Sequence, residues 1–367
     1  MALASSRGVT RQRTIDRRSA EGKSVDSARV LRFAGATAFA GVAALAIALW
    51  LGGDLTQSVI NGLVIGGTSD LTGWGLPASK LVMEVSSVGV IGMLLGCLLV
   101  PQENDGPSPT VRRCLRTASW LALAWAISTA VLLLFSWSDV IAQPVTQLSI
   151  TRLFTDTATT FPGAADFISS IAVAVVIAVA VKVTAARWGI LLLLALACYN
   201  LVPMALQGHA SHGEILKYSL IVHVIAVSLW VGGLTALLMH ARAEPVQLAV
   251  ALPRFSLIAL GCYVAVAASG SVAVWKLLGA VPALWGSRYG VLVLLKATAL
   301  IALGILGWWH RRHTVGRISV SNEGTLVRRA FIRLAAAEIV VMVVAIAIAV
   351  ALSRTASPDT IVLHGNQ

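Results

Sequence analysis

Three histidines lie close together in the sequence, near the point where one apolar segment ends and the next begins. His209 and His212 belong to the polar stretch Gly208–Glu214, and His223 follows inside a long apolar run. Imidazole is a preferred ligand of copper and other late transition metals. A histidine inside a segment of membrane-crossing length needs a specific reason, because a polar group in hydrocarbon is costly. This histidine cluster is therefore the first candidate metal site.

Further donor residues lie near these histidines or in another apolar segment. The spacing of three lets His209 and His212 bind one ion if their loop forms a helical turn, and a solvated loop without metal is the alternative. Histidine with a thioether suits Cu(I), whereas histidine with a carboxylate suits Cu(II). The pattern predicts a capture site at His209 and His212 with a deeper site at His223. The additional candidate ligands are Met83, Glu84, Met204 and Glu214.

The composition excludes a soluble protein. Of the 367 residues 57% are hydrophobic and only 12% are charged, and the mean hydropathy is +0.84. These values predict an all-α polytopic membrane helix bundle with about nine transmembrane helices. The predicted spans are Phe33–Leu51, Leu81–Val100, Thr117–Phe135, Ala164–Val181, Trp188–Leu206, Tyr218–Met239, Phe255–Trp275, Tyr289–Trp309 and Ala330–Ser353.

The basic residues predict the orientation of these spans. Most of the 28 Lys and Arg residues fall in alternate loops, and such loops stay on the cytoplasmic side. We therefore expect a cytoplasmic N-terminus and a C-terminus outside. The net charge of +12 then reflects topology and attraction to membrane lipids rather than nucleic acid. The expected regions are a basic cytoplasmic tail (1–32), a five-span region (33–215), a four-span domain (216–353) and a short external tail (354–367).

Ionisable side chains inside the predicted spans are few, and each is a functional hypothesis because of its burial cost. With the predicted orientation, Glu84, His223 and Lys296 lie roughly 5 to 10 Å below the outer surface. All three can meet in one outward-facing polar cavity. Glu338 approaches the middle of the last span, where it either forms a buried ion pair with Lys296 or passes a cation inward. The sequence does not decide between these two roles.

The cysteines and the remaining histidines carry weaker signals. Cys97, Cys198 and Cys262 fall in predicted spans and Cys114 in a predicted inner loop, so no external disulfide is expected. No Cys-x-x-Cys metal motif occurs. His310 and His313 flank two arginines, which favours a basic membrane anchor over an exit ligand. His240 and His364 give no signal.

Trp230 precedes two glycines in the span that carries His223. Gly232 and Gly233 permit a neighbouring helix to approach closely, and Trp230 supplies bulk beside them. A close-packed helix pair at this position would hold His223 in a fixed orientation, which a metal site requires.

The second part of the chain resembles the membrane domain of the copper resistance protein CopD family. The resemblance covers about 140 residues, from Tyr218 to Ala351. The residues that carry it are His223, Trp230-Val231-Gly232-Gly233, Arg254-Phe255-Ser256, Leu284 to Lys296, Arg328-Arg329 and Glu338. The approach at Gly208-His209 is similar to longer actinobacterial members. In those, a second membrane half similar to the cytochrome c oxidase assembly factor CtaG often follows, and we expect that half to be absent here.

The resemblance implies copper import or delivery at the cytoplasmic membrane, with supply to a copper oxidase. It implies a copper role for the histidines, while Lys296, Trp230 and Glu338 match the family pattern as supporting residues. Expected partners are the copper ion, an external copper-binding protein and a cytochrome oxidase assembly protein. No phosphate loop or nucleophile elbow occurs, so we expect a protein that is not an enzyme.

Two alternatives belong to other functional classes. A membrane haem protein with an electron-transfer or oxidoreductase role also uses histidines on apolar helices, but it needs a second imidazole at the depth of His223. An oxidase assembly factor without its own metal is the other alternative.

Overall fold

The computed structural model describes residues 32–51, 57–60, 63–66, 69–101, 106–149, 151, 155, 161, 163–184, 186–206, 214–239, 245–278, 282–310, 312 and 324–355. Within these residues, nine helices are long and apolar enough to cross a membrane, which confirms the predicted all-α membrane bundle. The helices are Arg32–Leu51, α2 (Asp70–Leu99), α3 (Pro109–Val140), α6 (Ala164–Val183), α7 (Arg187–Leu206), α8 (Glu214–Met239), α9 (Pro245–Leu278), α11 (Arg288–His310) and α13 (Gly324–Leu352).

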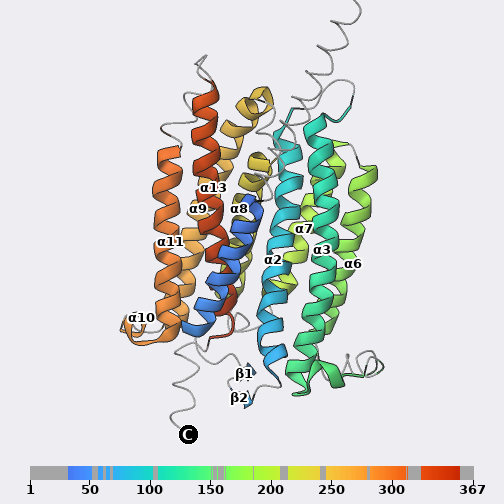
Figure 1. The fold of residues 1–367 in the computed structure, drawn as a ribbon, viewed down its shortest axis with the longest axis vertical. Helices are drawn as coiled ribbons and strands as arrows, with labels where there is room; N and C mark the ends of the chain where they lie inside the picture. Colours follow the sequence, from blue (N-terminus) through green and yellow to red (C-terminus); the bar gives the residue numbers. More distant parts are fainter. Residues whose placement is uncertain are drawn as a thin grey trace, which may run out of the picture.

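The nine long helices alternate in direction along the chain, so that their ends form two sides of the molecule (Figure 1). One side, which we call the hairpin end, carries the antiparallel strands β1 (Gln57–Ile60) and β2 (Leu63–Gly66). The short helices η1 (Val145–Gln147) and α10 (Ala283–Gly286) follow helix ends on that same side. The other side, the opposite end, contains the junction from α2 to α3.

The helix α2 begins well before the predicted start of its span at Leu81. Ser69 caps the helix, because its hydroxyl accepts a hydrogen bond of 3.2 Å from the Thr72 amide. The residues before Leu81 form the hairpin and the first turns of α2. Gly75 serves close packing, since a side chain there would collide with the Phe135 ring of α3.

The helix α3 begins at Pro109, with Ser108 as its N-cap. The Ser108 hydroxyl accepts a hydrogen bond of 3.3 Å from the Val111 amide. Proline at the first helical position loses no hydrogen bond, because that amide has no partner within the helix. The placement of Cys114 in a loop was wrong, since this residue is buried in the second turn of α3.

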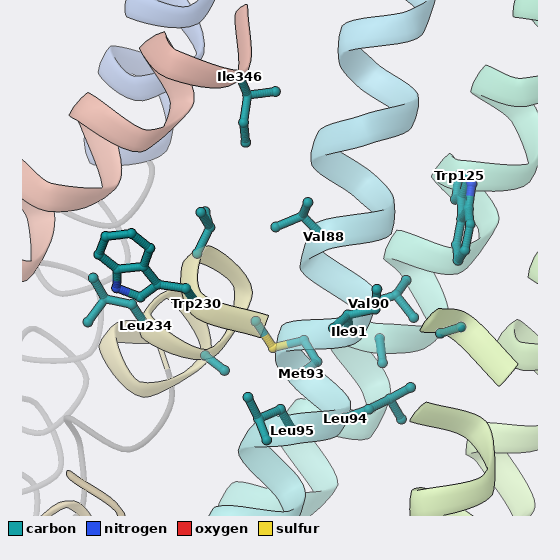
Figure 2. Close-up of a cluster of buried hydrophobic side chains, with 14 of the residues drawn as sticks. Val88, Val90, Ile91, Met93, Leu94, Leu95, Trp125, Trp230, Leu234 and Ile346 are labelled. Atoms are coloured by element: carbon teal, nitrogen blue, oxygen red, sulfur yellow. The ribbon is translucent and has the colours of Figure 1, made fainter. Parts of the chain in front are cut away.

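The helix α2 lies at the centre of the bundle. It contacts α3, α7, α8, α9 and α13. Of the residues in its apolar 18-residue stretch 72% are buried, compared with 17% in the corresponding stretch of α9. Figure 2 shows α2 side chains such as Ile91 and Met93 between Trp230 of α8 and Trp125 of α3. Interlocked side chains of this kind hold a helix in one position.

Glycines bring α2 and α8 into backbone contact. A side chain at Gly92 would collide with the backbone of Gly232, and one at Gly96 would come within 2.9 Å of the Ala236 methyl group. These close contacts confirm that the glycine pair of α8 serves helix packing. Both pairs have the same sequence offset, and both helices run from the hairpin end to the opposite end. The two helices are therefore parallel, and α2 residue 84 comes level with α8 residue 224.

The helices α9 and α11 are packed more loosely than α2. Only 17% and 22% of the residues in their apolar 18-residue stretches are buried. Large apolar side chains such as Leu257, Val264 and Ile301 are exposed. Exposed apolar surface of this extent suits contact with lipid chains. The bundle therefore has a dense centre at α2 and a loosely packed edge at α9 and α11.

Candidate metal site

His223 is held by a hydrogen bond to the neighbouring helix α9. Its Nδ1 lies 2.9 Å from the Ser269 hydroxyl oxygen, and that hydroxyl lies 2.6 Å from the Ala265 carbonyl. Because the hydroxyl has one proton and donates it to the carbonyl, it accepts the proton of His223 Nδ1. With the proton on Nδ1, the lone pair of the neutral ring lies on Nε2, the atom that can bind a metal ion. The ring also interacts with the Val266 backbone. Such a partner behind a histidine is what orients a metal ligand.

Glu84 is a carboxylate at nearly the same height in the bundle as His223. The parallel register of α2 and α8 brings it beside residue 224, and its side chain is half-buried. Two cations act on it electrostatically: Lys80, one turn away on α2, and Lys296 of α11. Lys80 is also tied to α13, because its ammonium donates a hydrogen bond of 2.9 Å to the Ser353 hydroxyl. Glu84 therefore lies in a mainly positive surrounding.

Lys296 connects the two sides of this cluster. Its ammonium group interacts electrostatically with Glu84 and with the His223 imidazole. Three helices, α2, α8 and α11, thus bring one carboxylate, one imidazole and one ammonium group into electrostatic range. The sequence predicted that these three residues can meet in one outward-facing cavity, and the structure places them within electrostatic range of one another. Their role as a metal site stays a prediction. We call Glu84, His223 and Lys296 the polar cluster.

Glu338 lies elsewhere, on the wall of a cavity of about 560 Å³ between α8, α9, α11 and α13. The α11 residues that line this cavity run from Ile301 to Trp308, roughly 7 to 18 Å beyond Lys296 along the helix. The ion pair with Glu338, one of the two roles considered for that residue, is therefore replaced by an interaction of Lys296 with Glu84. Glu338 is only 5% exposed.

Trp230 lines the same cavity as Glu338. Its ring packs edge-on against Tyr263 of α9, with 5.7 Å between the ring centroids. The Tyr263 hydroxyl in turn reaches Gly304 of α11, where any side chain would collide with it. Trp230 therefore connects α8 to α9 and lies two turns from His223, so its place in the structure is that of a packing residue.

The two predicted methionine ligands lie outside the polar cluster. Met83 precedes Glu84, so its side chain points about 100° away around the helix, and it is 4% exposed in the hydrophobic core. Met204 of α7 packs against the same core. A thioether from either residue would reach the cluster only if the core repacked, which agrees with the adaptability of methionine.

The predicted capture residues His209 and His212 lie outside the residues that the structure describes. Glu214, a further candidate ligand, begins α8 and forms an exposed ion pair of 3.1 Å with Lys217. Among the described residues, no group of three or more His, Cys, Asp and Glu side chains is placed to hold a metal ion. The polar cluster supplies two donors, His223 and Glu84.

The donor set of the polar cluster is small and lies among positive charges. A neutral imidazole and a carboxylate both bind copper, while Lys296 and Lys80 repel any cation that approaches. A site with few ligands and two nearby ammonium groups binds a cation weakly. Weak binding permits release, which a transport pathway requires.

The described spans disfavour a bis-histidine haem. They contain two histidines, His223 in α8 and His310 at the last position of α11. Both helices run in the same direction, and His310 lies 13 residues further from its helix start than His223 does, about 20 Å along the axis. Two ligands of one haem iron must lie on opposite sides of a single plane.

Beyond His310, Arg312 stacks on the Trp308 ring at 4.6 Å, and His313 is outside the described residues.

Ser269 and Lys80 are members of this site that sequence reasoning missed. A serine in an apolar helix bonds its own helix carbonyl and gives no outward signal, and Lys80 was assigned to a loop. The only sequence signal for Ser269 is the small polar group Ser269-Gly270-Ser271 within an apolar run.

Comparison with protein families gives two matches. Residues 249–352 match the model of the family described as Copper resistance protein D. Residues 68–216 match the model described as Copper resistance protein D-like, N-terminal domain. Together the matches cover more than two thirds of the chain, and most of α8, with His223, lies between them. No curated protein and no solved structure matches the chain.

Proposed function

The chain belongs to the copper resistance protein D family, and from that premise we propose that it imports copper through the polar cluster. It is a copper-related, multi-pass membrane protein. In the proposal, the hairpin end faces outward, as the basic loops predict. Copper is captured by His209 and His212 and passes to His223 Nε2 with Glu84. The observation that supports this proposal is the hydrogen bond that His223 Nδ1 donates to the Ser269 hydroxyl, because it places the lone pair of the neutral ring on Nε2.

Lys296 has a specific role in this proposal. In the absence of copper its ammonium group compensates the half-buried charge of Glu84. A copper ion that reaches Glu84 and His223 competes with Lys296, because two cations close together repel each other. Binding of copper therefore displaces Lys296, and return of Lys296 releases copper. Such a tethered cation keeps the site weak enough for release.

The surroundings of the protein follow from the same proposal. The membrane is the cytoplasmic membrane, with the N-terminus inside. An external copper-binding protein delivers the ion, and the imported copper supplies a copper oxidase through an assembly protein. The chain itself carries no enzymatic activity and moves copper without chemical change of a substrate.

The test is copper accumulation in cells that depend on this protein for uptake. Cellular copper is measured by mass spectrometry for the parent and for His223→Ala, Glu84→Gln and the pair His209→Ala with His212→Ala. We expect His223→Ala to lose protein-dependent uptake, since it removes the central imidazole. The capture pair should show a higher half-saturating copper concentration, because the deeper site remains. Unchanged uptake in His223→Ala would overturn the proposed route.

A matched control separates loss of transport from loss of protein. Ser271→Ala changes a serine of α9 near the cluster whose hydroxyl donates to its own helix at Ala267. It should leave uptake unchanged. Membrane levels of all variants are compared by immunoblot, and uptake is expressed per molecule. Equal losses in Ser271→Ala and His223→Ala would show that general disturbance, rather than the imidazole, limits uptake.

A further inference from the structure

Two free cysteines from different helices meet near the opposite end of the bundle. Cys97 lies two residues before the end of α2, and Cys114 lies in the second turn of α3. The two thiols interact with each other, the Cys97 thiol lies 3.8 Å from the Val111 carbonyl, and the Cys114 sulfur lies beside Gly96 of α2. They are 3% and 1% exposed and do not form a disulfide.

The pair differs from the other two cysteines of the chain. Cys198 of α7 and Cys262 of α9 are also free. In the described structure, neither of them interacts with another thiol. A buried single cysteine usually behaves as a small apolar residue. Two thiols in direct contact, in contrast, place two soft ligands at one point.

The number of donors selects the metal. Thiolates prefer soft ions such as Cu(I) and also bind Zn²⁺, but a structural zinc site requires four ligands. Within the described residues, no third His, Cys, Asp or Glu joins the two cysteines as a group that can hold an ion. Two thiolates on opposite sides satisfy a linear Cu(I) ion, which accepts two ligands. The pair therefore favours Cu(I) over Zn²⁺ and Cu(II).

Two arginines provide positive charge next to this pair. Arg187 of α7 donates a hydrogen bond of 2.9 Å to the Leu98 carbonyl, and Arg254 of α9 donates one of 3.3 Å to the Leu99 carbonyl. They compensate the negative end of the α2 dipole, which would otherwise disfavour thiolates at this position. Positive charge at this end of α2 also balances the net negative charge of a Cu(I) ion bound by two thiolates.

We propose that Cys97 and Cys114 form a two-coordinate Cu(I) site between α2 and α3. Binding of Cu(I) releases two thiol protons to water and replaces the interaction between the thiols with two sulfur–copper bonds. Copper keeps its oxidation state in this step. The inference rests on the proposed function for the identity of the ion, and it adds a second site about 20 Å along α2 from Glu84.

In the predicted orientation, this second site lies at the cytoplasmic side. An ion that leaves the polar cluster would then meet ligands of greater affinity for Cu(I) near the end of its path. Thiolate capture at this end would favour inward movement, because it removes copper from the weaker site. The Cys pair is thus an acceptor site for imported Cu(I).

The test is titration of the purified full chain in detergent with Cu(I), without oxygen and in competition with a chromogenic Cu(I) chelator. The variant Cys97→Ser with Cys114→Ser removes both thiolates. The variant Cys198→Ser with Cys262→Ser removes the same number of cysteines elsewhere and is the matched control. We expect the first variant to lose one tightly bound Cu(I) per chain and the control to retain it.

The same titration of His223→Ala separates this inference from the proposed function. If Cys97→Ser with Cys114→Ser binds as much Cu(I) as the parent, the inference is overturned, whatever His223→Ala does. Loss of one Cu(I) only in the cysteine variant supports the acceptor site. If His223→Ala then also imports copper normally in cells, the proposed route fails while the acceptor site stands.

A spectroscopic measurement covers the case in which the double cysteine variant does not fold. The His223→Ala chain, which retains both thiols, is loaded with one equivalent of Cu(I) and examined by X-ray absorption at the copper edge. Two sulfur neighbours and no nitrogen or oxygen neighbour are expected. A spectrum dominated by nitrogen or oxygen ligands would overturn the acceptor site.

Discussion

The helix pair α2 and α8 and the helix pair α9 and α11 are packed in contrasting ways. At Gly92 and Gly232 the backbones of α2 and α8 touch, so that neither glycine has room for a single methyl group. Between α9 and α11 lies part of a cavity of about 560 Å³, and the two helices meet where the Tyr263 hydroxyl reaches Gly304. One pair is fixed by backbone contact, and the other is joined by a side chain that can move.

The polar cluster combines residues from both pairs. The donors His223 and Glu84 belong to the tightly packed helices, whereas their partners Ser269 and Lys296 belong to α9 and α11. A small displacement of α11 can therefore move Lys296 away from Glu84 without moving either donor. Packed interfaces change between discrete arrangements, and the loosely packed pair is where such a change costs least. The contrast assigns ligand binding to one pair and control of binding to the other.

The largest expected effect comes from breaking the tight pair. Gly92→Ala adds a methyl group that would collide with the backbone of Gly232, and backbone cannot move aside as a side chain can. Overpacking typically costs about 1 to 3 kcal/mol, and we expect at least about 3 kcal/mol here. The measurement is thermal unfolding in detergent, with bound Cu(I) as a second readout. A Gly92→Ala chain as stable as the parent would contradict the contact between α2 and α8.

The number of spans and the meeting of the polar cluster follow from hydropathy and depth. A charged residue in a span must have a partner, and the depths of Glu84, His223 and Lys296 agree because all three are measured from the same membrane surface. The starts of α2 and α3 could not be predicted in this way. Helix that continues beyond the membrane is polar and glycine-containing, as in residues 70–80, and thus looks like a loop.

The contact between Cys97 and Cys114 was missed for the same reason. Once Pro109 is assigned to a loop, Cys114 falls outside the helix and has no fixed direction. Ser269 was missed because nothing in the sequence shows that its hydroxyl accepts a proton from another helix. Both contacts depend on how helices pack against each other, and helix packing cannot be deduced from the hydropathy of a single segment.

The next largest effect tests the contribution of α9 to the donor His223. Ser269→Ala removes the hydroxyl that orients the ring and retains its proton on Nδ1. Loss of a partner behind a metal ligand typically costs 10- to 100-fold in affinity, and we expect copper affinity at the polar cluster to fall within about that range. The measurement is the half-saturating copper concentration for uptake. Ser271→Ala is the control, and equal values for both variants would mean that Ser269 does not orient His223.

A smaller effect of opposite sign is expected for α11. Lys296→Gln removes the ammonium group that repels copper, so the polar cluster should bind copper roughly tenfold more tightly, a change of about 1.4 kcal/mol. Release should slow accordingly, and maximal uptake should fall although affinity rises. Lys276→Gln is the control, because that lysine lies in the last turn of α9 with its ammonium group over the Trp275 ring. Weaker copper binding in Lys296→Gln would contradict competition between lysine and copper.

The smallest effect is expected for a substitution in α9. Gly261 of α9 has no heavy atom within 4 Å of the position that a methyl group would take, so Gly261→Ala meets no obstacle. Alanine favours a helix over glycine by up to about 1 kcal/mol, and the chain should become slightly more stable. Thermal unfolding beside Gly92→Ala gives the comparison directly, since the two substitutions are chemically the same. A destabilisation by Gly261→Ala as large as that by Gly92→Ala would show that loss of the glycine, rather than the backbone contact at Gly92, sets the effect.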